Sequence, residues 1–403
     1  MTHVSRIRPL VVGILLALSL NLTPGAAEAT SNHLDPISMS FPSPQTGFVL
    51  SLYDCAAETC AVLQGTDDAA STWSDVATPR QLGKGLQLAS WGTYGSSYAT
   101  LTVHFADALD GWIYGTVPAP VTPDTSDPNW VSRLWSTHNG GTTWRQVALR
   151  PLRVTGGVVQ MATRGAWTYL FGGSNTSGAS YILTTRSNVD QWTSNSNAQM
   201  GTPAGGSPLE GAFSFHGTSG WFVAGNDRGF TAGALLKDGV WRTWKGPSTE
   251  ASSFCPIVTV TTKVLLAECQ SAGFIYLPAA SVPRDWNNGA SWLFISYDAG
   301  ATFQPLRQLS RSYKGSYSTV PGLPAAPEPG TILLQRATNS GNEMVRTTNR
   351  GRSWRVVLKQ SVSQVVFTNR ADGFAIVQQR ADQITSSLFA TNDAGGHWSS
   401  VSL

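Results

Sequence analysis

The sequence comprises 403 residues, of which 13% are charged and 41% are apolar, and its formal net charge is +3. This near-neutral balance argues against generic nucleic-acid binding, which needs a strongly basic surface. Few stretches carry apolar residues at helical spacing, whereas short runs of β-branched and aromatic residues alternate with Gly, Asn and Asp. The composition therefore predicts strands and turns.

The first 29 residues have the order of a secretory signal. Arg6 and Arg8 precede the apolar run from Leu10 to Leu20, and Ala27-Glu28-Ala29 is a small-x-small cleavage site. The run is too short to cross a hydrocarbon core about 30 Å thick, and no other stretch is long enough, so we expect no transmembrane segment. We expect a secreted protein, either extracellular or periplasmic. An uncleaved N-terminal anchor is the alternative.

Four cysteines form two local pairs in the sequence, an even number that favours disulfides in an exported protein. Cys55 and Cys60 are close together, while Cys255 and Cys269 flank a possible hairpin centred near Thr262. We expect both pairs to be disulfide-bonded. Metal ligation is the alternative, but Cys-x-x-Cys and Cys/His spacings are missing. We predict no metal and no cofactor.

An eight-residue pattern, Ser/Thr-x-Asp/Asn-x-Gly-x-Thr/Ser-Trp/Phe, recurs along the chain, and we call each copy a box. In chain order the boxes lie at 66–73 (Ala70 replaces the glycine), 137–144, 185–192 (a remnant), 237–241 (shortened), 296–303, 347–354 and 391–398 (His397 replaces the hydroxyl). The closing aromatics are separated by 71, 48, 49, 62, 51 and 44 residues. A period near 50 is typical of a propeller blade of four antiparallel strands.

A second motif keeps phase with the boxes. A Gly-aromatic pair opens an apolar strand upstream of most of them, at Gly47-Phe48, Gly111-Trp112, Gly220-Trp221 and Gly373-Phe374, with Ala166-Trp167 as a degenerate version. Two motifs that recur in one order are much harder to obtain by chance than one, so the repeat is a structural unit.

The residue types of the boxes suit tight turns between the outer two strands of a blade. An Asp or Asn side chain accepts hydrogen bonds from its own turn, and glycine supplies a positive φ. We expect the turns to share one rim and each aromatic to be buried between blades. The predicted structural residues are Asp68, Trp73, Asn139, Gly141, Trp144, Asp298, Gly300, Phe303, Asn349, Gly351, Trp354, Asp393, Gly395 and Trp398.

These motifs resemble the Asp-box (BNR-type) repeats of sialidases, sortilin-type receptors and photosystem II assembly factors of the Ycf48 type, most closely the last. The resemblance runs from about Met39 to the C-terminus. Together with the repeats it implies an all-β chain, with one seven-bladed β-propeller of four-stranded antiparallel blades over residues 30–403, after the signal peptide expected at residues 1–29. The motif recurs in enzymes and in non-enzymes, so it leaves the function open.

A glycoside hydrolase is the enzyme hypothesis, because sialidases resemble this chain. Sialidases bind the substrate carboxylate with three arginines, one of them in the first blade, but the first arginine after the predicted signal is Arg80, beyond the first box. Hydrolysis also needs two acids facing one bond. Nothing in the spacing pairs any two of the candidates Asp107, Asp110, Asp227, Glu268 and Asp285. We therefore favour a non-catalytic protein, with a glycosidase as the alternative.

Charge placement supports the binding hypothesis. Residues 30–130 hold ten acids against two bases, whereas residues 331–380 hold eight bases against two acids. We expect a monomer that binds a protein or glycan partner and does not bind nucleic acid. The alternative is that these charges pair across the ring closure. The sequon at Asn175 matters only in a eukaryotic host. The candidate binding residues are Arg346, Arg350, Arg352, Arg355 and Arg370.

Overall fold

The computed structural model describes residues 33–55, 58–82, 100–118, 130–152, 154, 157–173, 180–194, 210–225, 231–247, 252–271, 291–310, 323–338, 341–380 and 383–403. The predicted signal peptide, Asn175, Asp227 and Asp285 lie outside these residues. His33–Leu403 form one compact unit. Within the described ranges there is no helix, and none therefore that could span a membrane.

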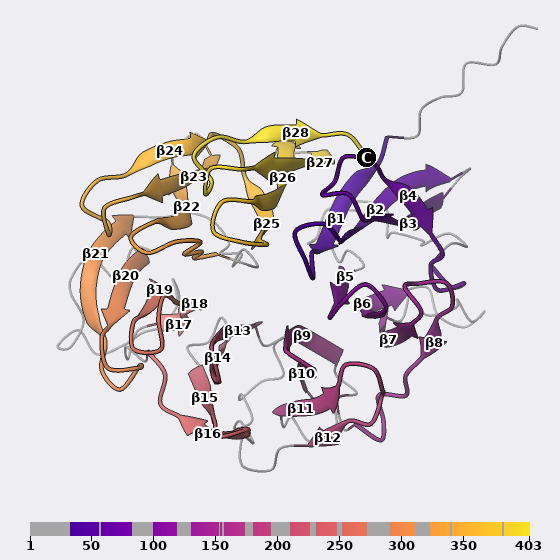
Figure 1. Ribbon diagram of the computed structural model, residues 1–403, viewed down its shortest axis with the longest axis horizontal. Helices are drawn as coiled ribbons and strands as arrows, with labels where there is room; N and C mark the ends of the chain where they lie inside the picture. Colours follow the sequence, from indigo (N-terminus) through magenta and orange to yellow (C-terminus); the bar gives the residue numbers. More distant parts are fainter. Residues whose placement is uncertain are drawn as a thin grey trace, which may run out of the picture. The chain divides into compact units, whose positions relative to one another are not determined.

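The strands form seven antiparallel sheets, the blades, arranged in a ring (Figure 1). This confirms the predicted seven-bladed β-propeller. Blades 1 to 3 consist of β1 (Asp35–Ser40), β2 (Gly47–Cys55), β3 (Glu58–Thr66) and β4 (Ser74–Val76); β5 (Thr100–Phe105), β6 (Asp110–Pro118), β7 (Trp130–His138) and β8 (Arg145–Gln146); and β9 (Gly157–Arg164), β10 (Trp167–Gly173), β11 (Ser180–Arg186) and β12 (Thr193–Ser194).

The remaining blades follow the same order from the inside of the ring outwards. They consist of β13 (Glu210–His216), β14 (Ser219–Gly225), β15 (Thr231–Lys237) and β16 (Val240–Trp244); β17 (Ser252–Phe254), β18 (Ile257–Thr259), β19 (Leu265–Ser271), β20 (Ser291–Ser296) and β21 (Gln304–Ser310); β22 (Ile332–Thr338), β23 (Gly341–Thr347) and β24 (Arg355–Leu358); and β25 (Val362–Phe367), β26 (Gly373–Arg380), β27 (Gln383–Thr391) and β28 (Ser399–Val401).

Two blades depart from the regular pattern at their inner strand. In blade 5 that strand is split into β17 and β18, and both pair with β19. In blade 6 the described residues form, at the inner position, a bridge between Ala325 and Leu333, whose two N–H···O bonds are each 2.9 Å long. Each blade is built from described strands that follow one another in sequence, and none of these strands is exchanged between the two ends of the chain.

The core consists of seven apolar clusters, one at each interface between neighbouring blades. Successive side chains of a strand point to opposite faces, so one strand serves two interfaces. In β10, for example, Leu170 packs against blade 2, whereas Tyr169 and Phe171 pack against blade 4. This explains why the second strand of most blades is apolar throughout rather than alternating.

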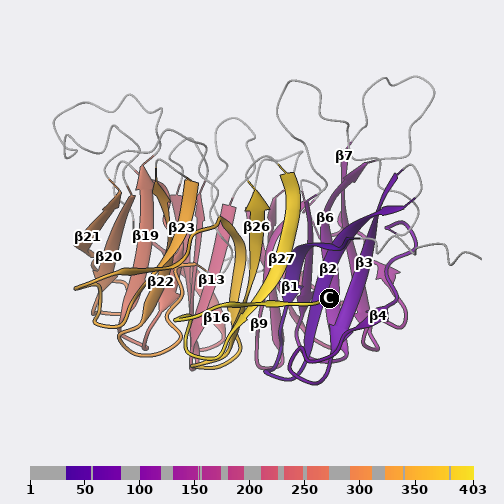
Figure 2. The same cartoon turned by 90° about the horizontal axis from the view of Figure 1, so that it is seen from above.

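The five boxes other than the remnant and the shortened one close their turns through the Asp or Asn side chain and the first Ser/Thr hydroxyl. In the fifth blade, the carboxylate of Asp298 accepts the Thr302 amide at 2.9 Å and the Thr302 hydroxyl at 2.6 Å, and Ser296 Oγ accepts the Gly300 amide at 2.8 Å. These bonds hold the pKa of Asp298 at about 2. Because alternate connections of an antiparallel blade lie at the same end, all boxes share one face, along the lower edge of Figure 2. We call it the turn face.

The expected burial of the box aromatics is only partly correct. Each described aromatic packs in the cluster between its own blade and the preceding one. Trp241 is 1% exposed, but the other six, among them Trp73 and Trp398, are half-buried. The turn lies at the outer rim, so the edge of each ring stays in contact with solvent.

Side chains of one blade cap the inner strand of the next, which has no partner strand on its channel side. At five of the seven junctions, within the described residues, a side-chain oxygen accepts a backbone N–H from the following blade. The bonds run from Met39 N to Gln364 Oε1 (2.9 Å), Val103 N to Ser38 Oγ (3.1 Å), Phe105 N to Ser40 Oγ (2.8 Å), Met161 N to the Tyr114 hydroxyl (3.2 Å), Thr259 N to Ser214 Oγ (2.9 Å) and Val362 N to Gln335 Oε1 (2.9 Å).

The interface between blades 7 and 1, which we call the seam, closes the ring without ion pairs. Gln364 also donates to Met39 O at 2.8 Å, and the rings of Phe41 and Phe374 stack 3.8 Å apart. The C-terminus lies beside blade 1 (Figure 1). Among the described residues, no acid of 30–130 forms an ion pair with a base of 331–380. Apolar packing and hydrogen bonds therefore close the ring here.

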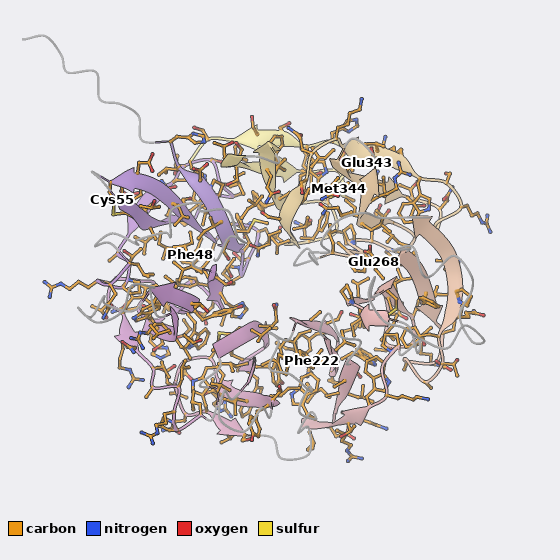
Figure 3. The ribbon with its side chains drawn as sticks, turned by 180° about the vertical axis from the view of Figure 1, so that it is seen from behind. Phe48, Cys55, Phe222, Glu268, Glu343 and Met344 are labelled. Carbon is orange, nitrogen blue, oxygen red and sulfur yellow. A yellow bond between two sulfur atoms is a disulfide. The ribbon has the colours of Figure 1, made fainter. Side chains whose placement is uncertain are left out.

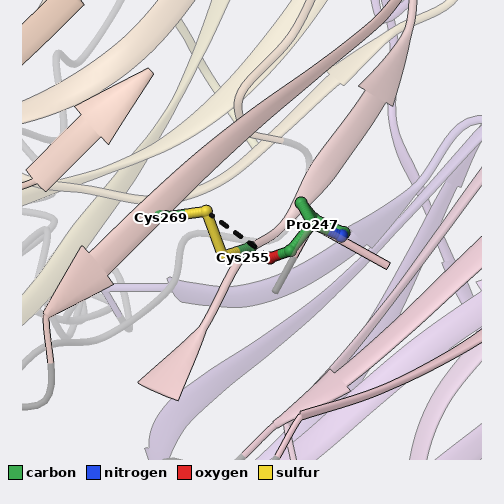
Figure 4. Close-up of a disulfide and its surroundings, with 3 residues drawn as sticks. All are labelled: Pro247, Cys255 and Cys269. Carbon is green, nitrogen blue, oxygen red and sulfur yellow. Dashed lines mark hydrogen bonds between the residues drawn. A yellow bond between two sulfur atoms is a disulfide. The ribbon is translucent and has the colours of Figure 1, made fainter. Parts of the chain in front are cut away.

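Both expected disulfides are present, Cys55–Cys60 and Cys255–Cys269. The second joins the inner strand of blade 5 to β19, and both of its cysteines are buried. Cys269 Sγ lies 4.0 Å from the carbonyl oxygen of Pro247, and Figure 4 shows the two residues beside Cys255. Because a disulfide sulfur carries no hydrogen, this is a van der Waals contact. The bridge is thus packed within the interface between blades 4 and 5.

Candidate functional site

A cavity of about 630 Å³ lies against the inner strands β1, β5, β9 and β25 of blades 1, 2, 3 and 7. Its lining includes Pro42, Ala106, Gly165 and Val366, which stand where these strands meet their turns. The cavity therefore extends to the turn face. Its volume is within the range of pockets that bind small ligands.

The cavity is lined by neutral groups. Its described lining holds no Asp, Glu, Lys or Arg side chain. Hydrogen-bonding groups and apolar side chains can bind a ligand, but the described lining lacks the pair of carboxylates that glycoside hydrolysis uses. The polar lining residues are Ser38, Ser40, Thr102, His104, Tyr114, Gln160, Thr163, Ser363 and Gln364.

His104 is the one histidine among the described lining residues. Its Nε2 lies 2.7 Å from Thr163 Oγ1, and a chain of hydroxyls continues to Thr168 (3.0 Å) and Ser187 (2.9 Å). The ring is half-buried and lies against Trp112. Burial lowers the pKa of His104 to about 4, so the imidazole is neutral and held in a fixed orientation at physiological pH.

Tyr114 is neutral as well, because burial raises the pKa of its phenol above the ordinary value. Its hydroxyl accepts the Met161 amide, one of the inter-blade caps. The wall of the cavity is thus held in place by bonds between blades.

The acids considered for hydrolysis do not converge. Asp107 accepts two amides within its own turn, and Asp110 Oδ1 lies 2.8 Å from His138 Nδ1. Glu268 is buried in β19, on the same side of the strand as Leu266, which faces blade 6 (Figure 3). Burial raises the pKa of Glu268 to about 8. None of these three lines the cavity.

Sequence reasoning missed a charged cluster between blades 2 and 3. Asp190 accepts Ser136 Oγ at 2.6 Å, Arg145 at 2.6 Å and Trp112 Nε1 at 3.2 Å, and lies 3.3 Å from His138 Nε2. Burial alone would raise the pKa of Asp190, but these hydrogen bonds outweigh it and lower the pKa. The cluster joins two blades. Asp190 belongs to the remnant box, whose sequence gives no sign of its partners.

The candidate arginines fall into two groups. Arg346 and Arg355 are cross-strand partners, and they donate to the Asp393 and Gly396 carbonyl oxygens of the last box at 3.1 and 3.4 Å. Arg346 is only 8% exposed, against expectation, because it packs under that box. Arg350, Arg352 and Arg370 are exposed in turns of the turn face, and the described residues offer them no ion pair.

The fold and the cavity define the class of this protein, a seven-bladed β-propeller with an uncharged central cavity over its described lining. No family model and no curated protein matches the sequence. Two similar solved structures are "YCF48 bound to D1 peptide" (14% identity, TM-score 0.53, 90% of this chain and 94% of that one) and a PL25 ulvan lyase bound to an oligosaccharide (10% identity, TM-score 0.52, 92% and 96%). The first is consistent with a Ycf48-like propeller. At these identities the likeness shows the fold alone.

Proposed function

We propose that this protein is an exported, non-catalytic, monomeric binding module that presents the turn face of its ring to a protein or glycan partner. The observation that carries the proposal is the uncharged lining of the central cavity. Such a site can recognise a ligand but lacks the paired carboxylates that glycoside hydrolysis requires.

Two further observations support the proposal. The two disulfides are compatible with an oxidising compartment outside the cytosol. A similar propeller carries a bound peptide, as its description states, which favours a protein partner. The glycosidase alternative rests on the resemblance of the boxes to those of sialidases. The likeness to the ulvan lyase is one of fold alone, and none of the described candidate acids lines the cavity.

Three exposed arginines of the turn face complete the proposed surface, Arg350, Arg352 and Arg370. Arg346 and Arg355 belong to the junction between blades 6 and 7 and support the last box. A partner held by the exposed three binds more weakly as salt rises, because the Debye length falls from about 10 Å at 0.1 M to about 3 Å at 1 M.

The test is hydrolysis by the purified mature chain. We expect no turnover of sialosides, aryl glycosides or ulvan oligosaccharides. Turnover that is lost in Glu268→Gln or Asp110→Asn, with the fold retained, would establish the glycosidase instead. Light scattering at increasing concentration tests the monomer, and a dimeric mass contradicts it.

A further inference from the structure

We propose that the central cavity takes an uncharged peptide segment of a protein partner, inserted from the turn face. This rests on the proposed function and specifies its site and ligand class. The cavity and the exposed arginines belong to the same face, so a partner that docks there reaches both.

The charge of the ligand follows from the wall. No described lining residue can pair with an ammonium, guanidinium or carboxylate, and His104 is itself neutral. A charged group that enters loses water without gaining a counter-ion, which is strongly unfavourable. A neutral amide or hydroxyl exchanges water for the hydrogen-bonding groups of the wall at little cost.

Two lining side chains are free enough to contact the ligand. Gln160 Nε2 has a long bond of 3.4 Å to Met161 O, and Ser363 Oγ has one of 3.4 Å to Ile376 O. Both exceed the usual length of such bonds, so a better-placed ligand group can replace them. By contrast, Ser38, Ser40 and Gln364 cap backbone amides at 2.8–3.1 Å and build the wall. Gln160 and Ser363 stand at the two ends of the arc, on β9 and β25.

The aromatic lining favours a peptide over a sugar. A pyranose ring packs its apolar face on an exposed aromatic face of similar size. Phe41 and Phe105 are only 8% and 2% exposed, because they stack on Phe374 and Phe48. Tyr114 is 3% exposed. The described lining therefore offers no such platform, whereas its apolar and amide-like groups suit small side chains and peptide bonds.

The mouth of the cavity also suits a peptide. Pro42, Ala106 and Val366 are half-buried and apolar, and Gly165 has no side chain. They leave the turn face open over an arc of four blades. The inter-blade caps make the wall rigid before a ligand binds, which reduces the entropy lost on binding.

The experiment selects displayed random heptapeptides against the full mature protein and measures their affinities by calorimetry. We expect selected peptides with an uncharged centre. Gln160→Trp fills the cavity and weakens them by about tenfold or more, a change of at least about 1.4 kcal/mol. The matched control Gln378→Trp, at an exposed position of β26, leaves their affinity unchanged. Thermal melts establish that both variants fold.

A second variant tests the chemistry without filling the space. Gln160→Glu places one carboxylate in the cavity, so we expect selection against it to yield peptides with a central Lys or Arg. The proposal is overturned if affinities survive Gln160→Trp in folded protein, if Gln160→Glu leaves the selected sequences unchanged, or if neutral oligosaccharides bind and peptides do not. If the peptides still bind to Gln160→Trp, at another part of the surface, only the cavity is refuted as their site. Turnover of glycosides refutes the proposed function itself.

Discussion

Two successive backbone positions have a positive φ in six of the seven box turns, all except the remnant at 185–192. Arg350 and Gly351, at 57° and 82°, are one example, and Ala299 and Gly300, at 59° and 85°, are another. The sequence predicts this at the glycine, since glycine alone adopts such angles at no cost. It does not predict it at the preceding position, where Ala and Arg stand. There the hydrogen bonds to the Asp or Asn side chain impose the angle.

Ala70 occupies the glycine position of the first box with a φ of 66°. A left-handed conformation costs an L-residue about 1–2 kcal/mol. Glycine removes this strain, but it also raises the entropy of the unfolded chain, which offsets part of the gain in stability. We expect Ala70→Gly to raise the free energy of unfolding by about 0.5–1 kcal/mol, measured in urea. Ala77→Gly, at an exposed position without positive φ, should lower it. Equal effects of the two would contradict the argument.

Asp298 links the boxes to pH. Its pKa is about 2 in the folded protein against an ordinary value of 3.8. A lowered carboxyl pKa stabilises the fold above the ordinary value, and this contribution is lost as pH falls through the folded value. The second and sixth boxes carry Asn at this position instead, as Asn139 and Asn349. In the sixth, Asn349 Oδ1 accepts the Ser353 amide at 2.9 Å. A neutral side chain therefore builds the same turn.

We expect Asp298→Asn to leave stability at neutral pH nearly unchanged and to reduce its loss between about pH 4 and pH 2. Urea unfolding at a series of pH values measures this. The control Asp75→Asn, exposed on β4, should keep the wild-type profile. If Asp298→Asn kept the pH profile of the wild-type protein, the turn would not be holding this carboxylate in its charged form.

At the scale of elements, the spacing of the boxes predicts the seven blades but not the irregular inner strands of blades 5 and 6. Pro256 separates β17 from β18, and Pro324, Pro327 and Pro329 lie in the segment that forms only a bridge in blade 6. Proline donates no ladder hydrogen bond, so it interrupts a strand. This local rule is readable in the sequence once the blade boundaries are known.

The caps between blades could not be predicted. Gln364 and Met39 are 325 residues apart, and nothing local marks either as half of a pair. The same holds for Asp190 and its partners Trp112 and Ser136. Periodicity reveals the repeated unit, whereas contacts between units depend on how successive blades stack.

Gln364 provides the test at this scale. Replacing it with Ala leaves both the N–H and the carbonyl of Met39 unpaired at the seam. We expect a loss of about 1–3 kcal/mol in the free energy of unfolding, because each unpaired buried group bears its full desolvation cost. Gln378→Ala, exposed on β26, should change it by less than about 0.5 kcal/mol. Similar losses in both variants would mean that the cap does not hold the seam.

At the scale of the molecule, six junctions are also linked by the chain, whereas the seam depends on side chains alone. Phe41 packs in the seam, stacked on Phe374. We expect Phe41→Ala to cost about 3–5 kcal/mol. Hydrogen exchange should accelerate most in blades 1 and 7.

The matched variant is Phe171→Ala, at the junction of blades 3 and 4, where Phe171 is fully buried and 4.6 Å from the Phe222 ring. There we expect the acceleration in blades 3 and 4, with the seam protected. A uniform acceleration around the ring in both variants would indicate that no junction opens before the others.

The contiguity of each blade has a consequence for how the protein is made. A chain that leaves the ribosome from its N-terminus can complete the backbone ladder of a blade as soon as its last strand emerges, without waiting for later sequence. At the four capped junctions other than the seam, the earlier blade provides the acceptor for the next one. Only β1 must wait: its Met39 amide stays exposed until Gln364, almost the whole chain later, is synthesised. Synthesis thus builds an open spiral that becomes a ring in its final step.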